Sequence, residues 1–185
     1  THNYIIGADP AEGNPTSDDS AACVVDLDTW DEVAVFADKW EPKVFGAHID
    51  TIAAYYHHAS CMPERNNHGH ALILALQETG STLVLKGHSD EKLGWLNNAK
   101  GKTLMYDSGA DALMSQSLIV NDPYTIDQLV SIEADTLAAP EGLHDDRATA
   151  LMLAVAGLKF RWISGTPSTI IAAHDPLDEY DTRSH

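Results

Sequence analysis

The sequence predicts an α/β protein with a mixed β-sheet, and the order of its apolar segments leads to that class. Short apolar runs come first, at 4–8, 22–27 and 33–36, with a turn-forming segment at 28–31. Segments with helical spacing then alternate with further short runs. Strands followed by helix–strand alternation are typical of a mixed sheet. The short connections predict that the first three strands form an antiparallel meander.

The helical segments carry apolar residues at a spacing of three and four residues. In His48–His58 these residues include Ile49, Ile52 and Tyr56, and Asp145–Phe160 is the clearest helix. The other expected elements are strands at 60–64 and 82–85, helices at 69–78, 108–118 and 125–130, and an element of either type at 132–136.

The composition indicates one globular domain. Hydrophobic residues make up 44% of the 185 residues, which is too many for a disordered chain and enough for a full core. No apolar run approaches the roughly 20 residues of a membrane span, and no signal peptide is visible, so we expect neither membrane association nor secretion. Cys23 and Cys61 are the only cysteines, which excludes a disulfide scaffold and favours a reducing compartment. The start at Thr1 suggests a piece of a longer protein.

The charge balance narrows the possible ligands. The net charge is −17, because 28 Asp and Glu residues stand against 11 Lys and Arg residues. A protein that binds DNA tightly without a partner usually presents a basic face. We therefore do not expect this chain to bind nucleic acid tightly by itself. Acidic residues can instead hold divalent cations, and those cations then recruit phosphate groups.

Acidic residues stand at strand ends and at a helix start. Asp9 ends the first buried strand, Glu64 follows a later one, and Asp145 and Asp146 open the last helix directly after His144. Converging carboxylates repel one another, and a pair of divalent cations relieves that repulsion, as in two-metal phosphoryl chemistry with Mg²⁺ or Mn²⁺. Each position also has an ordinary structural explanation, because carboxylates start turns, cap helices and pair with neighbouring cations.

Three motifs in these regions resemble the nuclease domain of tailed-phage large terminase subunits. The first is Gly7–Gly13 (GADPAEG) followed by Ser17–Ala21 (SDDSA). The second is Glu64–Gly69 (ERNNHG), and the third is His144–Leu151 (HDDRATAL). Their order and spacing agree with the family, and the resemblance extends from about residue 3 to residue 160. The combination is specific, whereas any single motif would not be.

The resemblance implies an RNase H-like fold, with a mixed sheet whose first three strands are antiparallel and helices on both faces. It implies metal-dependent endonucleolytic cleavage of double-stranded viral DNA during genome packaging, with two Mg²⁺ or Mn²⁺ ions. By similarity, Asp9, Glu64 and one of Asp145 or Asp146 are metal ligands, with Asp146 slightly favoured. A further acidic ligand in the loop after the first strand is Asp18 or its neighbour Asp19, since an inserted segment obscures the match.

Further residues near the motifs are candidates for proton transfer and DNA contact. His144 can orient the attacking water or move a proton, or it can simply face solvent at a helix start. We expect a mobile hairpin over 92–102 whose lysines contact phosphates, unless they only solubilise an exposed loop. The candidate DNA contacts are Lys86, Lys92, Lys100, Lys102, Arg65 and Arg147.

The resemblance also implies partners outside this chain. The family's full-length protein carries an N-terminal ATPase domain, and no phosphate-binding loop of that kind occurs here. The portal and the small terminase subunit of the packaging motor are further expected partners. Such a viral protein acts in the host cell cytoplasm. We expect the nuclease domain to span 1–165 and a polar tail to follow at 166–185.

Three other interpretations remain open on the sequence. The first is a zinc module, because several histidines lie near one cysteine, although their spacing fits no standard zinc motif: His57, His58, Cys61, His68 and His70. The second is another RNase H-like nuclease, such as a Holliday-junction resolvase, with the same carboxylates and a branched substrate. The third is a non-catalytic scaffold, which the retention of every acidic position disfavours.

Overall fold

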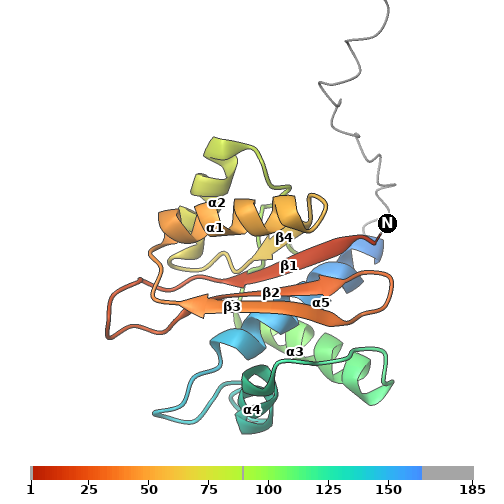
Figure 1. The fold of residues 1–185 in the computed structure, drawn as a ribbon. Helices are drawn as coiled ribbons and strands as arrows, with labels where there is room; N and C mark the ends of the chain where they lie inside the picture. The colour runs from red at the N-terminus through yellow and green to blue at the C-terminus, as the bar shows by residue number, and fades with distance from the viewer. Residues whose placement is uncertain (1, 89, 164–185) are drawn as a thin grey trace, which may run out of the picture.

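The computed structural model describes residues 2–88 and 90–163 and has three layers, with a sheet between two layers of helices (Figure 1). The strands are β1 (Tyr4–Asp9), β2 (Ser20–Asp26), β3 (Glu32–Asp38) and β4 (Ser60–Pro63). The helices are α1 (Pro42–Tyr55), α2 (Gly69–Thr79), α3 (Ala99–Met114), α4 (Pro123–Ser131) and α5 (Asp146–Ile163). The predicted domain boundary at 165 and the tail at 166–185 lie outside the described residues.

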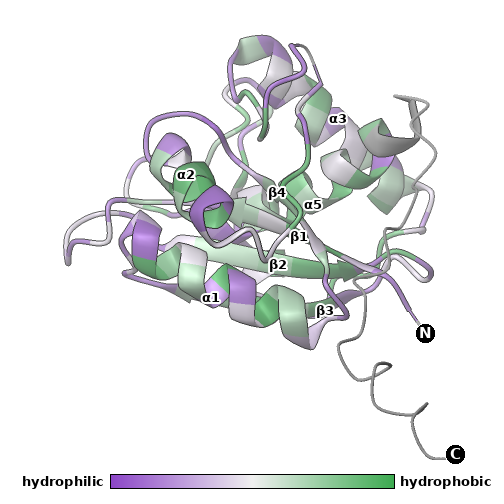
Figure 2. Cartoon of the chain, turned by 90° about the horizontal axis from the view of Figure 1, so that it is seen from above, coloured by the Kyte–Doolittle hydropathy of each residue, from purple (hydrophilic) through white to green (hydrophobic). Residues whose placement is uncertain are grey.

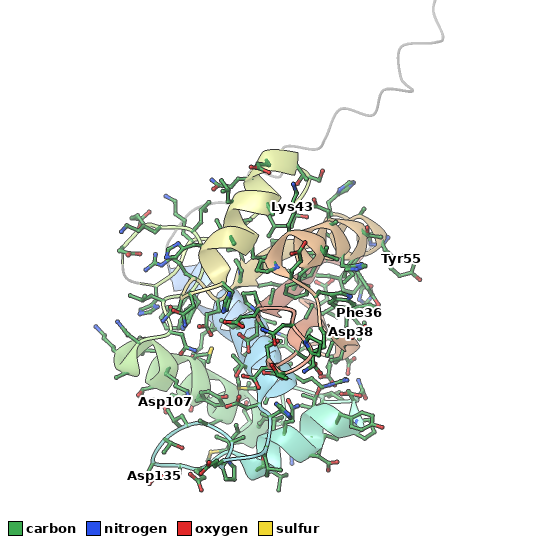
Figure 3. All side chains as sticks on the ribbon, turned by 90° about the vertical axis from the view of Figure 1, so that its left-hand side faces the viewer. Phe36, Asp38, Lys43, Tyr55, Asp107 and Asp135 are labelled. Atoms are coloured by element: carbon green, nitrogen blue, oxygen red, sulfur yellow. The ribbon has the colours of Figure 1, made fainter. Side chains whose placement is uncertain are left out.

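The sheet is mixed, with strand order β3-β2-β1-β4. β1 and β2 are antiparallel, as are β2 and β3, so the predicted meander is confirmed. β4 returns parallel to β1, with Ala8 opposite Pro63. β1, β3 and β4 therefore run in the same direction and end at the same edge of the sheet. Figure 3 faces that edge and labels Asp38 at the end of β3.

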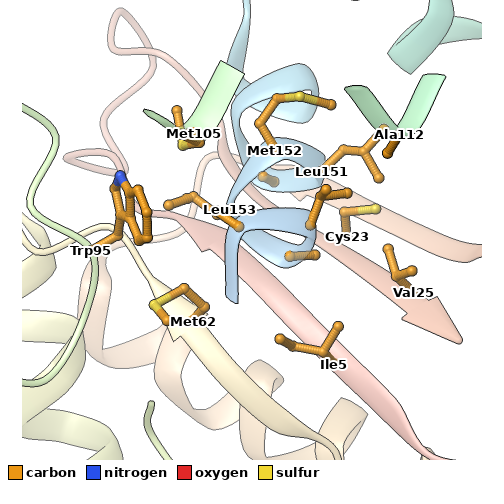
Figure 4. Packing of buried hydrophobic residues seen from close by; sticks show 14 of the residues in the cluster. Ile5, Cys23, Val25, Met62, Trp95, Met105, Ala112, Leu151, Met152 and Leu153 are labelled. Atoms are coloured by element: carbon orange, nitrogen blue, oxygen red, sulfur yellow. The ribbon is translucent and has the colours of Figure 1, made fainter. Parts of the chain in front are cut away.

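Each face of the sheet buries a separate apolar cluster, and alternation along the strands decides which side chain joins which. Ile6 and Ala8 of β1 pack toward α1 and α2, whereas Ile5 packs toward α3 and α5. Figure 4 shows the second cluster, in which Met152 and Met105 fill the space between these two helices. Hydrophilic and hydrophobic residues alternate along α1 and α2 (Figure 2), and Val44, Tyr55 and Leu74 are exposed on their outward sides. Helices therefore cover both faces, as predicted.

Two helices are longer at their N-terminal ends than the periodicity predicts. α1 begins at Pro42, six residues before the predicted start, because proline suits the first turn of a helix and Phe45 packs into the core. α1 ends at Tyr55, so the prediction of helix to His58 is wrong: His57 and His58 have φ of 52° and 59°. α3 begins at Ala99 rather than 108, and ends at Met114 rather than 118.

Other predictions are corrected between β4 and α3. The strand predicted at 82–85 reduces to an isolated parallel bridge between Cys61 and Val84, because the chain turns away to pair Lys86 with Leu93. The hairpin predicted over 92–102 is wrong, because its second half is the first turn of α3. The helices predicted at 69–78, 125–130 and 145–160 are confirmed with small shifts at their ends. The ambiguous segment 132–136 forms turns.

Cys23 and Cys61 are buried and free, so neither takes part in a disulfide. None of the described helices combines the length and the hydropathy that crossing a membrane requires.

Candidate metal centre

Asp9 and Glu64 meet because β1 and β4 are parallel neighbours. Asp9 is the last residue of β1, and Glu64 directly follows β4. The Glu64 backbone N–H donates to the Ala8 carbonyl oxygen at 2.8 Å, which continues the ladder to the strand ends. Both carboxylates therefore stand at the edge of the sheet where open α/β sheets bind ligands. Both residues are half-buried.

The start of α5 adds the third acidic position. Asp146 is the first residue of the helix and is buried, with 6% of its surface exposed. Asp145 directly precedes the helix, and its carbonyl oxygen accepts a hydrogen bond from the Thr149 N–H at 2.8 Å. The Asp145 carboxylate accepts from the Ala139 N–H at 3.1 Å. The two neighbouring carboxylates therefore have different surroundings.

The loop between β1 and β2 brings Asp18 and Asp19 to the same place. The Asp19 backbone N–H donates to Asp146 Oδ2 at 3.1 Å, which ties the loop to α5. The Asp19 carboxylate pairs with Lys39 Nζ at 2.6 Å. Asp18 instead approaches His144, whose Nδ1 lies 3.0 Å from Asp18 Oδ1 and 3.9 Å from Asp146 Oδ2. Asp18, His144 and Asp146 thus form a group that can hold a metal ion.

A cavity of about 430 Å³ opens between these elements. Asp9, Glu64, Asp146, Asp18 and Asp19 all line it, whereas Asp145 does not. The rest of the lining consists of Pro10, Ala11, Glu12, Ser17, Asn66, Asn67 and His68. The predicted acidic residues are therefore brought together, and the cavity distinguishes Asp146 from Asp145.

Burial, together with neighbouring carboxylates, raises the pKa values of the acidic residues in the cavity. Burial raises the pKa of Asp9 well above its usual range, and the charges of Glu64 and Asp146 raise it further. Burial likewise raises the pKa of Glu64, against the lowering effects of a hydrogen bond from Asn97 and of the Lys102 charge. Burial is also the main reason that the pKa of Asp146 rises to about 6. Ionising these groups together costs free energy, so the site favours a compensating cation.

The donor set fits a hard divalent cation. The acidic cavity residues offer carboxylate oxygens, which suit Mg²⁺ and Mn²⁺ better than softer metals. The zinc module predicted as an alternative has no such set of ligands. Among the described residues, two groups of side chains could hold a metal ion, and neither includes Cys61 or the histidines near it in the sequence. Cys61 is fully buried in the core between the sheet and α1 and α2.

The predicted basic residues are not all free to contact DNA. Arg65 is buried, and its guanidinium donates two hydrogen bonds to Asp90, both at 2.8 Å. Arg147 lies 3.3 Å from Asp122 and stacks over the Tyr124 ring, so it joins α5 to α4. These two arginines thus have structural partners.

The predicted lysines lie on two neighbouring segments. Lys86 pairs with Glu91 at 2.8 Å, whereas Lys92 and Lys100 are exposed. Lys102, in the first turn of α3, is half-buried and close enough for its charge to lower the pKa of Glu64. Of the predicted lysines, Lys102 is therefore the one that the structure connects to the acidic cavity.

Two residues of the site were not predicted. Lys39 directly follows β3, which ends at the same edge of the sheet as β1. The predicted meander therefore already implied that a residue just after β3 lies at the same edge as Asp9. Asn97 donates to Glu64 Oε2 at 2.7 Å. No spacing in the sequence indicates this contact, because it depends on how the chain between β4 and α3 folds.

The raised pKa of Asp146 predicts how stability depends on pH without metal. The folded protein binds the Asp146 proton more tightly than the unfolded chain, because the pKa is about 6 against 3.8. This contribution to stability is fully present below about pH 4 and is lost as the pH rises through about 6. In EDTA, we expect Asp146→Asn to exceed wild type in unfolding free energy by up to about 3 kcal/mol at pH 7.5.

Urea denaturation at several pH values measures this difference, and the two proteins should converge near pH 4. A difference that stays constant between about pH 4 and 7.5 would contradict the assignment, because it would not follow the ionisation of Asp146.

The chain resembles several solved protein structures. No protein-family model matches the chain, and no curated protein matches it by sequence. The large terminase nuclease of thermophilic phage G20c with bound magnesium superposes with a TM-score of 0.67 and 21% identity, covering 84% of this chain and 81% of that one. The large terminase nuclease domain of Thermus phage P74-26 gives 0.65 and 22%, covering 83% and 78%.

A more distant structure shares the same arrangement. The human cytomegalovirus terminase nuclease domain, soaked with manganese and with an inhibitor bound, has a TM-score of 0.52 and 13% identity, covering 83% of this chain and 82% of that one. The predicted fold is thereby confirmed, since the mixed sheet with an antiparallel start and helices on both faces is shared with these nucleases.

Proposed function

We propose that the chain is the nuclease domain of a viral large terminase subunit, which cleaves double-stranded DNA with divalent metal ions during genome packaging. One observation carries this proposal. Carboxylates from β1, β4, the loop after β1 and the start of α5 converge on one cavity, within a fold shared with terminase nucleases. Burial raises the pKa values of Asp9 and Glu64, and for Asp9 the charges of Glu64 and Asp146 raise it further, as is common for carboxylates at functional sites.

The proposed metal ligands are Asp9, Glu64, Asp146 and Asp18, with Mg²⁺ or Mn²⁺ as the ions. We choose Asp146 over Asp145 because only Asp146 lines the cavity. We choose Asp18 because the Asp19 carboxylate is paired with Lys39. Bound ions would activate a water molecule for attack on a phosphodiester and stabilise the charge on the leaving oxygen.

The other residues have supporting roles in this proposal. His144 lies within 3.0 Å of Asp18, so it orients that carboxylate and can accept a proton at the cavity edge. In this proposal Lys102, whose charge reaches Glu64, contacts a phosphate that flanks the cut, and the exposed Lys92 and Lys100 contact phosphates further along the DNA. Affinity for DNA remains weak and salt-dependent because the chain carries a net charge of −17.

The weak intrinsic affinity also favours assistance from partners. An N-terminal ATPase domain of the same protein, the portal and the small terminase subunit would hold the DNA while this domain cuts. In this proposal the protein acts in the cytoplasm of the infected cell. A Holliday-junction resolvase would use similar carboxylates, but the structures reported above, which share this fold, are all terminase nucleases.

A plasmid-cleavage assay tests the proposed function. At low salt, we expect the protein to nick and linearise supercoiled plasmid with Mn²⁺ or Mg²⁺ and to leave it intact in EDTA, because the carboxylates bind phosphate only through a cation. Agarose gels separate the supercoiled, nicked and linear forms. A four-way junction and a linear duplex of the same sequence serve as parallel substrates.

The outcomes separate the alternatives. Cleavage of the junction alone would contradict the terminase proposal and support a resolvase. If plasmid and junction both stay intact, calorimetry with Mn²⁺ decides: binding would indicate a nuclease that needs its ATPase domain, and the lack of binding would reject a metal nuclease.

A further inference from the structure

We infer that Asn97 is a positioning residue, which holds the Glu64 carboxylate in the orientation that metal binding requires. This inference rests on the proposed metal site and extends it to a residue outside the acidic motifs. Asn97 Nδ2 donates to Glu64 Oε2 at 2.7 Å. Among the described residues, this is the one hydrogen bond that reaches the Glu64 carboxylate, so the second oxygen, Oε1, stays available to a ligand.

The chain around Asn97 is fixed before any metal binds. Trp95 pairs with the backbone on both sides of Glu64: its N–H donates to Pro63 and its carbonyl oxygen accepts from Arg65, both at 2.8 Å. Asn98 then caps α3 by accepting from the Gly101 N–H at 2.8 Å. Asn97 therefore sits between a sheet-like bridge and a helix start, and its backbone has little freedom.

The side chain of Asn66 completes this support. Its Oδ1 accepts from the Asn97 N–H at 3.0 Å, and its Nδ2 donates to the Asn97 carbonyl oxygen at 3.1 Å. Asn66 also lines the cavity, two residues after Glu64 in the chain. The result is a closed arrangement in which Asn66 holds the backbone of Asn97, and the Asn97 side chain holds Glu64.

The hydrogen bonding of Asn97 itself shows which contact the arrangement favours. Asn97 Oδ1 is buried and has no hydrogen-bond partner among the described residues. A buried acceptor without a donor lowers the stability of the fold. The Asn97 amide nevertheless keeps the orientation in which its N–H donates to Glu64. A positioning role predicts this orientation, whereas an amide that only stabilised the fold would have both of its polar atoms hydrogen-bonded.

The expected consequence is an effect on metal affinity. Groups that hydrogen-bond to metal ligands fix their orientation, and their loss typically weakens metal binding about 10- to 100-fold. Asn97→Ala removes the donor to Glu64 but keeps both backbone contacts with Asn66. Asn98→Ser is the matched control, because it removes an amide one residue away and keeps a good helix cap.

Calorimetric titration of the full chain with Mn²⁺ tests the inference. We expect the dissociation constant to rise at least about 10-fold in Asn97→Ala and to stay unchanged in Asn98→Ser, while both metal-free variants unfold near the wild-type temperature. In cleavage assays, kcat at limiting Mn²⁺ should fall and recover at saturating Mn²⁺, with KM for DNA unchanged. A merely structural role would lower the unfolding temperature and leave the Mn²⁺ affinity unaltered.

Crystal structures of metal-free wild type and Asn97→Ala provide a second readout. We expect the Glu64 side chain to leave its wild-type position in the variant. Unchanged Mn²⁺ affinity in Asn97→Ala would overturn the inference. If wild type itself binds no Mn²⁺, the proposed function fails, and the crystal structures alone decide on Asn97: an unmoved Glu64 would then overturn the positioning role.

Discussion

Asp9→Ala should reduce metal-dependent plasmid cleavage by at least about 1,000-fold while making the metal-free protein more stable. Asp9 stands at the end of β1 in the cavity, so its loss removes a proposed ligand and several kcal/mol of transition-state stabilisation. The same carboxylate is costly to ionise without metal, because burial and the charges of Glu64 and Asp146 raise its pKa. Removing it therefore relieves the repulsion.

The measurements are plasmid cleavage with Mn²⁺ and urea denaturation in EDTA at about pH 7.5. Asp38→Ala is the matched control, because Asp38 ends β3 at the same edge of the sheet as Asp9, is exposed and does not line the cavity (Figure 3). We expect the control to cleave normally. An Asp9→Ala protein that is both inactive and less stable would indicate a structural carboxylate and contradict the metal-site interpretation.

The opposite directions of the two effects explain why the acidic positions were predictable from the sequence. A carboxylate at the end of a buried strand is costly to desolvate unless it is paired or binds a metal ion. Asp9 and Glu64 each stand at the end of a short apolar run, so both positions can be recognised in the sequence. The direction of β4 then follows from α1, which connects it to β3 and returns the chain in the direction of β3, and β3 runs parallel to β1 in the meander. Local sequence and topology suffice for these two residues.

Other parts of the site depend on contacts that no local pattern contains. The start of α3 was placed too late, because its first turn has few apolar residues and is held instead by the Asn98 cap and by the Trp95 indole N–H, which donates to Gly101. The contact between Asn97 and Glu64 depends on that placement. The partners of Arg65 and Arg147 were missed for the same reason, since Asp90 and Asp122 are distant in sequence.

Gly7→Ala is expected to destabilise the protein by about 3 kcal/mol, because Gly7 of β1 lies against the backbone of α5. A Cβ atom on Gly7 would lie inside the contact distance of the Ala150 carbonyl oxygen and 2.5 Å from the Ala154 N atom. Both are backbone atoms of the helix, so no side chain can rotate away. α5 must shift as a whole or the core must open. Urea denaturation measures the loss of unfolding free energy.

Gly80→Ala is the control for replacing a glycine without a clash. Gly80 ends α2 with φ of 65° and has no atom within 4 Å of the added Cβ, so its cost should be about 1 kcal/mol from backbone strain alone. A Gly7→Ala protein no less stable than Gly80→Ala would contradict the packing described above. Because α5 begins with Asp146, any shift that accommodates Gly7→Ala also moves Asp146 relative to Asp9. We therefore expect weaker Mn²⁺ binding in Gly7→Ala and not in Gly80→Ala, since the same contact that packs the helix on the sheet sets the distance between two proposed metal ligands.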